Sequence, residues 1–132
     1  FNRPVIESGG YSFQVISAAT LNAFAGILGF ELDAERAHAA VIATDCGGGR
    51  AAGIKLGADN ADDATTDGYI LGSLPSPDAQ ATDASGIGGV FNLPPGIAAV
   101  YGTRVETDER VFSSEVVLRA GYLTSIVRAP NL

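Results

Sequence analysis

Apolar residues recur at helical spacing in one part of the chain. Leu21, Phe24 and Leu28 fall on one face of a helix, because their separations match its repeat of about 3.6 residues. Gly29 follows directly, and glycine is the residue that most often adopts the left-handed conformation that ends a helix. The pattern therefore predicts a single helix near residues 18 to 28.

Elsewhere, apolar and polar residues alternate over short runs, which is typical of strands with one buried face. Tyr11, Phe13 and Val15 form one such run before the helix. Seven further strands are predicted at 37–44, 54–58, 69–71, 90–93, 97–105, 112–118 and 122–128. Short strands joined by tight turns must cover their apolar faces with one another, so we predict a mainly β fold: an antiparallel seven-stranded sandwich with one N-terminal helix.

Two polar stretches between the predicted strands have the composition of turns. Residues 45–50, D-C-G-G-G-R, are rich in glycine and connect the first two strands after the helix. Residues 83–86, D-A-S-G, suit a type I turn. Asp83 at the first position can accept backbone hydrogen bonds, and Gly86 suits the last position.

The segment Pro94-Pro95-Gly96 is the strongest turn signal in the chain. Proline at Pro95 presets φ near −65°, and Gly96 can supply the positive φ that a type II turn requires. On this basis we expect the strands at 90–93 and 97–105 to form an antiparallel hairpin.

Length and charge restrict the class of protein. The 132 residues match one domain in size, and the net charge is −7. An acidic chain repels the phosphate backbone, so nucleic acid is not an expected partner. The single cysteine, Cys46, excludes a disulfide within the chain.

The N-terminal region is unusual in its lack of charge. Residues 8–30 contain no Asp, Glu, Lys or Arg, but they are too polar and too rich in glycine for a membrane-spanning helix. The chain starts at Phe1 and has no methionine, which we interpret as a processed or trimmed start, consistent with a removed export signal.

Three segments resemble the carboxypeptidase regulatory-like domains. They are G-R-A-A-G-I-K-L at 49–56, A-T-D-A-S-G-I-G-G-V-F-N-L-P-P-G at 81–96, and V-V-L-R-A-G-Y-L-T at 116–124. The resemblance covers about residues 37 to 129, and its most specific part is 82–96. The chain departs from the family pattern at the first turn, which has no proline.

The resemblance implies a fold, a location and a general role. Members of this family are prealbumin-like (transthyretin-like, Ig-like) β-sandwiches of bacterial exported proteins, and they are usually non-catalytic companions. On this interpretation residues 37–132 are the sandwich and residues 1–36 an N-terminal strand–helix segment. The expected location is extracytoplasmic: periplasm, outer-membrane surface or secreted.

An enzyme hypothesis would rely on His38 and Cys46, the only residues of their kinds. They lie at opposite ends of one predicted strand, and eight extended residues span about 26 Å, far beyond hydrogen-bond reach. We therefore expect no enzyme, no catalytic residue and no cofactor. Cys46 is interpreted either as an incidental turn residue or as a thiol that links partner chains.

Oxygen-bearing side chains gather between the second and third predicted strands. They are Asp59, Asn60, Asp62, Asp63 and Asp67. Calcium binds six to eight oxygen ligands, but the spacing here lacks the glycine of the Ca²⁺-binding loop pattern. A solvated loop is favoured over a weak Ca²⁺ site, and no metal site is predicted.

The predicted function is a non-catalytic structural or protein-binding module, an accessory or repeating subunit of an extracytoplasmic bacterial assembly. The uncharged N-terminal region is the predicted contact, through Tyr11, Phe13, Phe24 and Phe30, because interface cores are depleted in charge and enriched in aromatic residues. The alternative is a carbohydrate-binding module. The absence of tryptophan and the presence of only four tyrosines make an aromatic sugar-binding platform less favourable.

Overall fold

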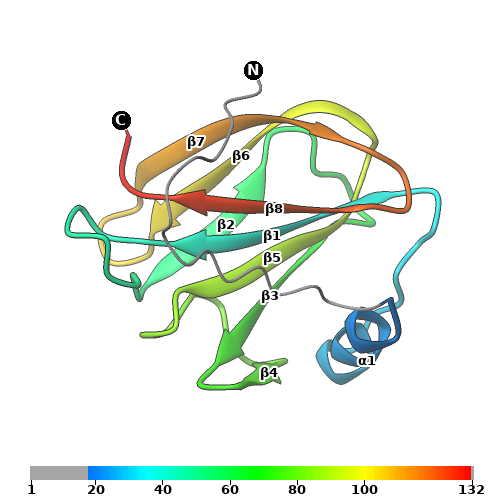
Figure 1. The fold of residues 1–132 in the computed structure, drawn as a ribbon, viewed down its shortest axis with the longest axis horizontal. Helices are drawn as coiled ribbons and strands as arrows, with labels where there is room; N and C mark the ends of the chain where they lie inside the picture. Colours follow the sequence, from blue (N-terminus) through cyan, green and yellow to red (C-terminus); the bar gives the residue numbers. More distant parts are fainter. Residues whose placement is uncertain (1–17, 132) are drawn as a thin grey trace, which may run out of the picture.

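The computed structural model describes residues 18–131, which form one helix and eight strands (Figure 1). The fold is mainly β, and the predicted helix near residues 18 to 28 is confirmed. The elements are α1 (Ala18–Leu28), β1 (Ala37–Ala43), β2 (Ile54–Ala58), β3 (Thr66–Leu71), β4 (Leu74–Ser76), β5 (Ile87–Leu93), β6 (Gly96–Arg104), β7 (Glu109–Leu118) and β8 (Leu123–Arg128). The strand predicted around Phe13 lies outside the described residues.

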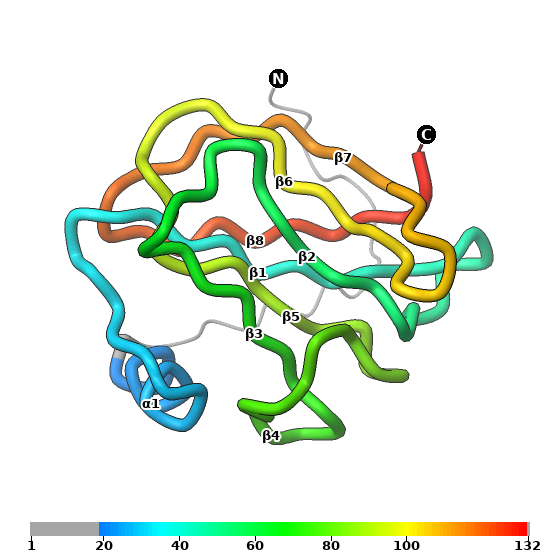
Figure 2. Tube along the Cα trace, turned by 180° about the vertical axis from the view of Figure 1, so that it is seen from behind, coloured from blue at the N-terminus to red at the C-terminus, as the bar shows by residue number. Residues whose placement is uncertain are grey.

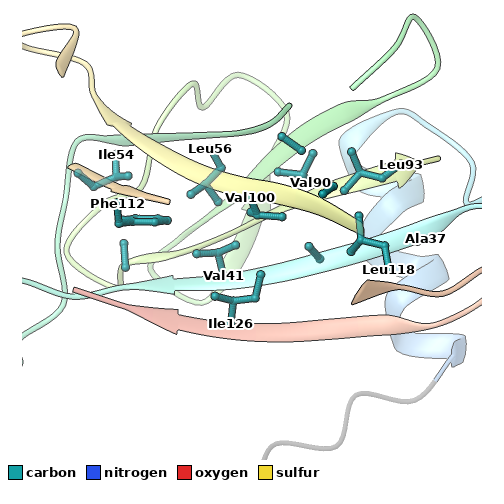
Figure 3. Packing of buried hydrophobic residues seen from close by; sticks show 14 of the residues in the cluster. Ala37, Val41, Ile54, Leu56, Val90, Leu93, Val100, Phe112, Leu118 and Ile126 are labelled. Atoms are coloured by element: carbon teal, nitrogen blue, oxygen red, sulfur yellow. The ribbon is translucent and has the colours of Figure 1, made fainter. Parts of the chain in front are cut away.

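The strands form two sheets of unequal width. The larger sheet has the order β4-β3-β5-β1-β8, and the smaller sheet has the order β2-β6-β7. Figure 2 shows the same arrangement from behind, with β2, β6 and β7 in front of the larger sheet. Apolar side chains from both sheets fill the space between them, including Val41, Val90, Val100, Phe112 and Leu118 (Figure 3). The structure is consistent with the predicted β-sandwich.

Two details of the predicted sandwich differ in the structure. There are eight strands in the described residues where seven were predicted, because the short strand β4, which contains Pro75, was not among the predicted strands. Proline is tolerated here because β4 is an edge strand and pairs only with β3. The sandwich is also not purely antiparallel, since β1 and β8 are parallel. The chain reaches β8 by crossing over from β7 in the other sheet.

The predicted hairpin around Pro94-Pro95-Gly96 is wrong. The flanking strands exist, but β5 pairs with β1 and β3, whereas β6 pairs with β2 and β7. The two prolines have no N–H to donate to a ladder, and Asn92 and Gly96 have φ values of 58° and 131°. These residues carry the chain from one sheet to the other instead of folding it back on itself.

The end of α1 follows from the sequence. The N–H of Phe30 donates to the carbonyl of Ala25, and the N–H of Gly29 donates to the carbonyl of Gly26. Gly29 has φ of 88°, so the helix ends in a Schellman motif. The ring of Phe30 then packs against Phe91 of β5, with ring centroids 5.2 Å apart.

The side chain of Leu28 at the end of α1 packs directly on Gly68 of β3. A Cβ built on Gly68 would lie 2.6 Å from Cδ1 of Leu28, so a side chain at this position would require the Leu28 side chain to move. The helix also contacts β4, and Figures 1 and 2 both place it at the β3–β4 side of the molecule. The helix therefore covers only part of the outer face of the larger sheet.

Tyr69 ties the two sheets together. Its ring is buried, and its hydroxyl donates to Oδ2 of Asp67 at 2.6 Å and accepts the N–H of Leu56 at 2.8 Å. Tyr69 belongs to β3 of the larger sheet, whereas Leu56 belongs to β2 of the smaller one. Burial, together with the hydrogen bond to Asp67, raises the pKa of Tyr69 far above its usual value, so the hydroxyl keeps its proton.

We predict that Tyr69→Phe lowers the free energy of unfolding by about 1–3 kcal/mol, because it leaves the buried N–H of Leu56 without an acceptor. Chemical denaturation measures the change. Tyr122→Phe is the matched control, since Tyr122 is 65% exposed, and it should change stability by less than about 0.5 kcal/mol. Equal effects of the two substitutions would contradict a stabilising bridge at Tyr69.

Candidate functional site

The edge strands of the two sheets differ in how they are protected. An edge strand exposes unpaired backbone N–H and C=O groups and can therefore pair with another chain. The edge of β2 is covered by Thr82, whose backbone N–H donates to the carbonyl of Ile54 and whose Oγ1 accepts the N–H of Ile54. The hydroxyl of Tyr69 covers the next group along this edge. The β2 edge is therefore not open.

Two further edges are restricted in other ways. Along β7, Asn131 bonds to the carbonyl of Val111 and to both backbone groups of Ser113. The same strand carries Glu109, Arg110 and Glu115, and charged residues are a common protection against edge pairing. Strand β4 has only three residues and contains a proline.

Strand β8 forms the other border of the larger sheet, and no described residue protects it in these ways. The carbonyls of Tyr122 and Arg128 accept N–H groups from the β1 side, at 3.1 and 2.8 Å. Because backbone groups of successive residues in a strand point to opposite sides, the N–H and C=O groups of Leu123, Ser125 and Val127 point away from β1. Within residues 18–131, no hydrogen bond reaches these outward groups.

The composition of β8 also favours pairing. Its sequence, L-T-S-I-V-R, has one charged residue, at the last position, and no proline or glycine. Ile126 points into the core, whereas Val127 is 59% exposed. An edge of six residues with a single charge at its end matches the geometry by which a sheet accepts an additional strand. We therefore consider the outward edge of β8 the candidate functional site.

A cluster of hydrogen bonds around Asn92 fixes the other end of the sandwich. Its side chain accepts the N–H of Asp33 at 2.9 Å and donates to the carbonyl of Glu31 at 2.8 Å. Its own carbonyl accepts hydrogen bonds from Arg36 and Thr65. These bonds hold the connector between α1 and β1 against β5. Sequence reasoning missed this role, although an asparagine tolerates the positive φ found here.

The two residues of the enzyme hypothesis, His38 and Cys46, lie at opposite ends of β1. His38 is buried in β1, where its Nδ1 accepts the N–H of Asn92 at 3.1 Å. Cys46 is exposed in the turn that follows the opposite end of the strand. Burial lowers the pKa of His38 below 6.5, although the backbone and charge of Asp33 oppose the shift. The neutral ring therefore acts as a structural acceptor.

Three carboxylates of the oxygen-rich stretch at 59–67 bond to other parts of the fold. Asp59 accepts the N–H of Ala99, Asp62 pairs with Arg36 at 2.8 Å, and Asp67 accepts the hydroxyl of Tyr69. The hydrogen bond from Arg36 is the main reason that the pKa of Asp62 is lowered. In residues 18–131 no group of three or more His, Cys, Asp and Glu side chains is placed to hold a metal ion.

The predicted turns at 83–86 and 94–96 differ in their geometry. The N–H of Gly86 donates to the carbonyl of Asp83 at 2.9 Å, and the Asp83 carboxylate also accepts from Ser85. Hydrogen bonds from Ser85 and Gly72 lower the pKa of Asp83. Pro94 and Pro95 instead form the crossing between the sheets described above.

Aromatic side chains give little support for a sugar-binding platform. The ring of Tyr101 lies over Gly57, and the guanidinium of Arg110 stacks on it with its Cζ 3.7 Å from the ring centroid. Tyr69 is buried and Tyr122 is exposed. Of the predicted partner contacts, Phe24 and Phe30 face the chain's own larger sheet, and Tyr11 and Phe13 lie outside the described residues.

Comparison of the chain with protein-family models and with curated proteins gave no match. The resemblance to carboxypeptidase regulatory-like domains therefore stays a prediction. No helix in the described part of the chain is long and apolar enough to cross a membrane.

The lowered pKa of His38 predicts a pH dependence of stability. As pH falls below 6.5, the unfolded chain binds a proton at His38 that the folded chain does not, so the free energy of unfolding should decrease until the pH passes the lower folded pKa. A His38→Gln variant should lose this slope in thermal unfolding measured at pH values from 7 downward to about 5. An unchanged slope would contradict a buried neutral His38.

The Asn92 cluster predicts an order of effects for two substitutions. Asn92→Gly loses the side-chain bonds but adopts the positive φ without strain, whereas Asn92→Ala loses the same bonds and retains a Cβ in a left-handed conformation. We expect both variants to be destabilised, Asn92→Ala by about 1 kcal/mol more. Denaturant titration measures the order, and a more stable alanine variant would contradict it.

Proposed function

We propose that this chain is a non-catalytic structural or protein-binding module, an accessory or repeating subunit of an extracytoplasmic bacterial assembly. Its contact is the outward edge of β8, which accepts an extended segment of a partner subunit. The observation that carries the proposal is the unprotected edge formed by Leu123, Ser125 and Val127, next to three edges that are capped, charged or very short.

Hydrogen bonding and burial both support strand addition at this edge. Backbone groups of a sheet edge give affinity to an incoming strand, and neighbouring side chains give specificity. Leu123 and Val127 lie on the outer face of the larger sheet, because Ile126 between them is buried. An incoming strand would therefore extend a face that is already apolar, which favours an uncharged partner segment.

A binding role fits the chemistry of the described residues better than catalysis. The buried histidine, the buried tyrosine and the carboxylates of the 59–67 loop each bond to a group that holds the fold together. We include an extracytoplasmic location and a prealbumin-like fold type in this proposal because residues 82–96 resemble carboxypeptidase regulatory-like domains. A glycan-binding role has weaker support among residues 18–131, since the guanidinium of Arg110 stacks on the Tyr101 ring.

Substitutions on β8 test the proposal. Ser125→Pro removes one outward N–H but leaves the β1–β8 ladder intact, and Val127→Lys places a charge beside the edge. Both should abolish incorporation into the native complex while the isolated chain stays folded by circular dichroism. Ile97→Lys is the matched control, because Ile97 is 69% exposed on the other sheet. Incorporation of both β8 variants at the wild-type level would contradict the proposal.

Hydrogen exchange tests the same edge directly. The amides of Leu123, Ser125 and Val127 should exchange at least about tenfold more slowly in the complex purified from the bacterial envelope than in the isolated chain. Equal rates in the two states would show that no strand pairs with β8.

A further inference from the structure

A cavity of about 320 Å³ lies at the end of the sandwich where β1 ends and β2 begins. Its walls come from the turn at 45–50, the start of β2, the end of β6, the start of β7 and Pro130 after β8. Figure 1 shows these segments at the end of the molecule that lies away from α1. The volume is at the lower end of the range for small-molecule sites, about 300–1,000 Å³.

The inner wall of the cavity is apolar. Ile54, Val111 and Phe112 line it, and all three side chains are buried. Figure 3 shows Ile54 and Phe112 beside each other at one end of the core. A molecule in the cavity would therefore contact core side chains and cover apolar surface from water.

Two arginines provide positive charge at the cavity. Arg104 lies directly opposite Ile54 in the β2–β6 ladder. Residues that lie opposite each other in such a ladder have their side chains on the same face of the sheet, so Arg104 approaches the cavity from the core face. Arg50 is the last residue of the turn at 45–50 and lines the cavity from the β1 side, where it bridges to Thr44.

Neither arginine pairs with a carboxylate. The one ion pair among residues 18–131 joins Arg36 to Asp62. Nη1 of Arg50 donates to the carbonyl of Ser85 at 3.3 Å, which orients the side chain and leaves its other N–H groups without a described partner. The side chain of Arg104 makes no hydrogen bond within the described part of the chain.

The carboxylates beside the cavity are turned away or unpaired. Asp45 lines the cavity, but its Oδ1 accepts the N–H groups of Gly47 and Gly49 at 2.8 and 2.9 Å, so the carboxylate is held in its own turn. Glu109 lies opposite Arg104 in β7 and makes no ion pair with it. The cavity therefore combines two available guanidinium groups with an apolar inner wall.

We propose that this cavity binds a small carboxylic acid in its anionic form. The carboxylate lies between Arg50 and Arg104, and the apolar part of the molecule lies against Ile54 and Phe112. A guanidinium donates two parallel hydrogen bonds to a carboxylate, which gives both affinity and orientation. At about 30 Å³ for each non-hydrogen atom, the cavity holds a molecule of about ten such atoms.

The apolar wall decides between kinds of anion. Inorganic phosphate would pair with the arginines but would leave Ile54 and Phe112 uncovered, whereas an aromatic or branched aliphatic carboxylate contacts both parts of the cavity. This site is separate from the outward edge of β8, so either proposal can fail without the other.

A titration with benzoate, followed by amide chemical shifts in nuclear magnetic resonance spectra, tests the site. Benzoate fits the volume, and benzamide is its neutral isostere. We expect saturable shifts for the amides of Thr44, Ile54 and Phe112 with benzoate. Benzamide and inorganic phosphate should each bind at least about tenfold more weakly, because the first lacks the charge and the second lacks the apolar part.

Arg104→Gln and Arg50→Gln should each weaken benzoate binding at least about tenfold. Lys55→Gln is the matched control, since it removes the same charge from the position opposite Thr103, next to Arg104. Lys55 is exposed and its neighbours in β2 are buried, so it points away from the cavity and its loss should leave the affinity unchanged. Circular dichroism establishes that each variant is folded, and Arg104→Gln decides alone if the loss of the bond to Ser85 unfolds the Arg50 variant.

Cys46 gives an independent measurement at the same site. It is the only thiol of the chain, it is exposed, and it lines the cavity. Bound benzoate should slow the alkylation of Cys46 by N-ethylmaleimide severalfold, whereas benzamide at the same concentration should not.

Four outcomes would overturn the inference. They are the absence of saturable shifts, equal affinity for benzoate and benzamide, wild-type affinity in the Arg104→Gln variant, and alkylation of Cys46 at the same rate with and without benzoate. Inorganic phosphate that binds as tightly as benzoate would also contradict it, because the site would then hold an adventitious ion only.

Discussion

The packing of a three-stranded sheet against a five-stranded sheet is the constraint on which the rest of the structure depends. The core lies between them, with Val41, Val90, Val100 and Phe112 in its interior. Because the smaller sheet ends earlier, its edge at β2 would expose backbone groups inside the molecule. Tyr69 and Thr82 satisfy those groups from the larger sheet and from the loop before β5. The larger sheet in turn has an outer face that α1 covers only in part.

The sequence predicted the positions of the helix and the strands better than it predicted which strands pair. Alternation and turn residues located the helix and most strands, because these signals depend on nearby residues. Pairing depends on residues far apart in the chain. Nothing local in 90–93 and 97–105 indicates that the two prolines lead the chain into the other sheet, and nothing local marks β8 as parallel to β1. The short strand β4 was not predicted, since a proline is disfavoured in a central strand and is tolerated only at an edge.

The candidate site was not predicted from the sequence for a similar reason. An edge is defined by the strand that is absent beside it, so the pattern L-T-S-I-V-R could not distinguish an edge from a central strand. The histidine and the carboxylates that were weighed for catalysis or metal binding, by contrast, have structural roles. His38 accepts a backbone N–H, and Asp59, Asp62 and Asp67 bond to neighbouring strands and loops. Asn92 lies in the segment N-L-P-P-G, which marks a turn. Only its contacts show that it holds the connector between α1 and β1 against β5.

We propose that the open edge of β8 receives a strand from a partner subunit. Nuclear Overhauser contacts between subunits, in an assembly of isotope-labelled and unlabelled chains, test it most directly. If β8 accepts the partner strand, the amide or Hα protons of Leu123, Ser125 and Val127 show contacts to an extended segment of the neighbouring subunit. Contacts between subunits that are confined to another surface, such as the exposed pair Ile97 and Val117, with none at β8, would contradict it.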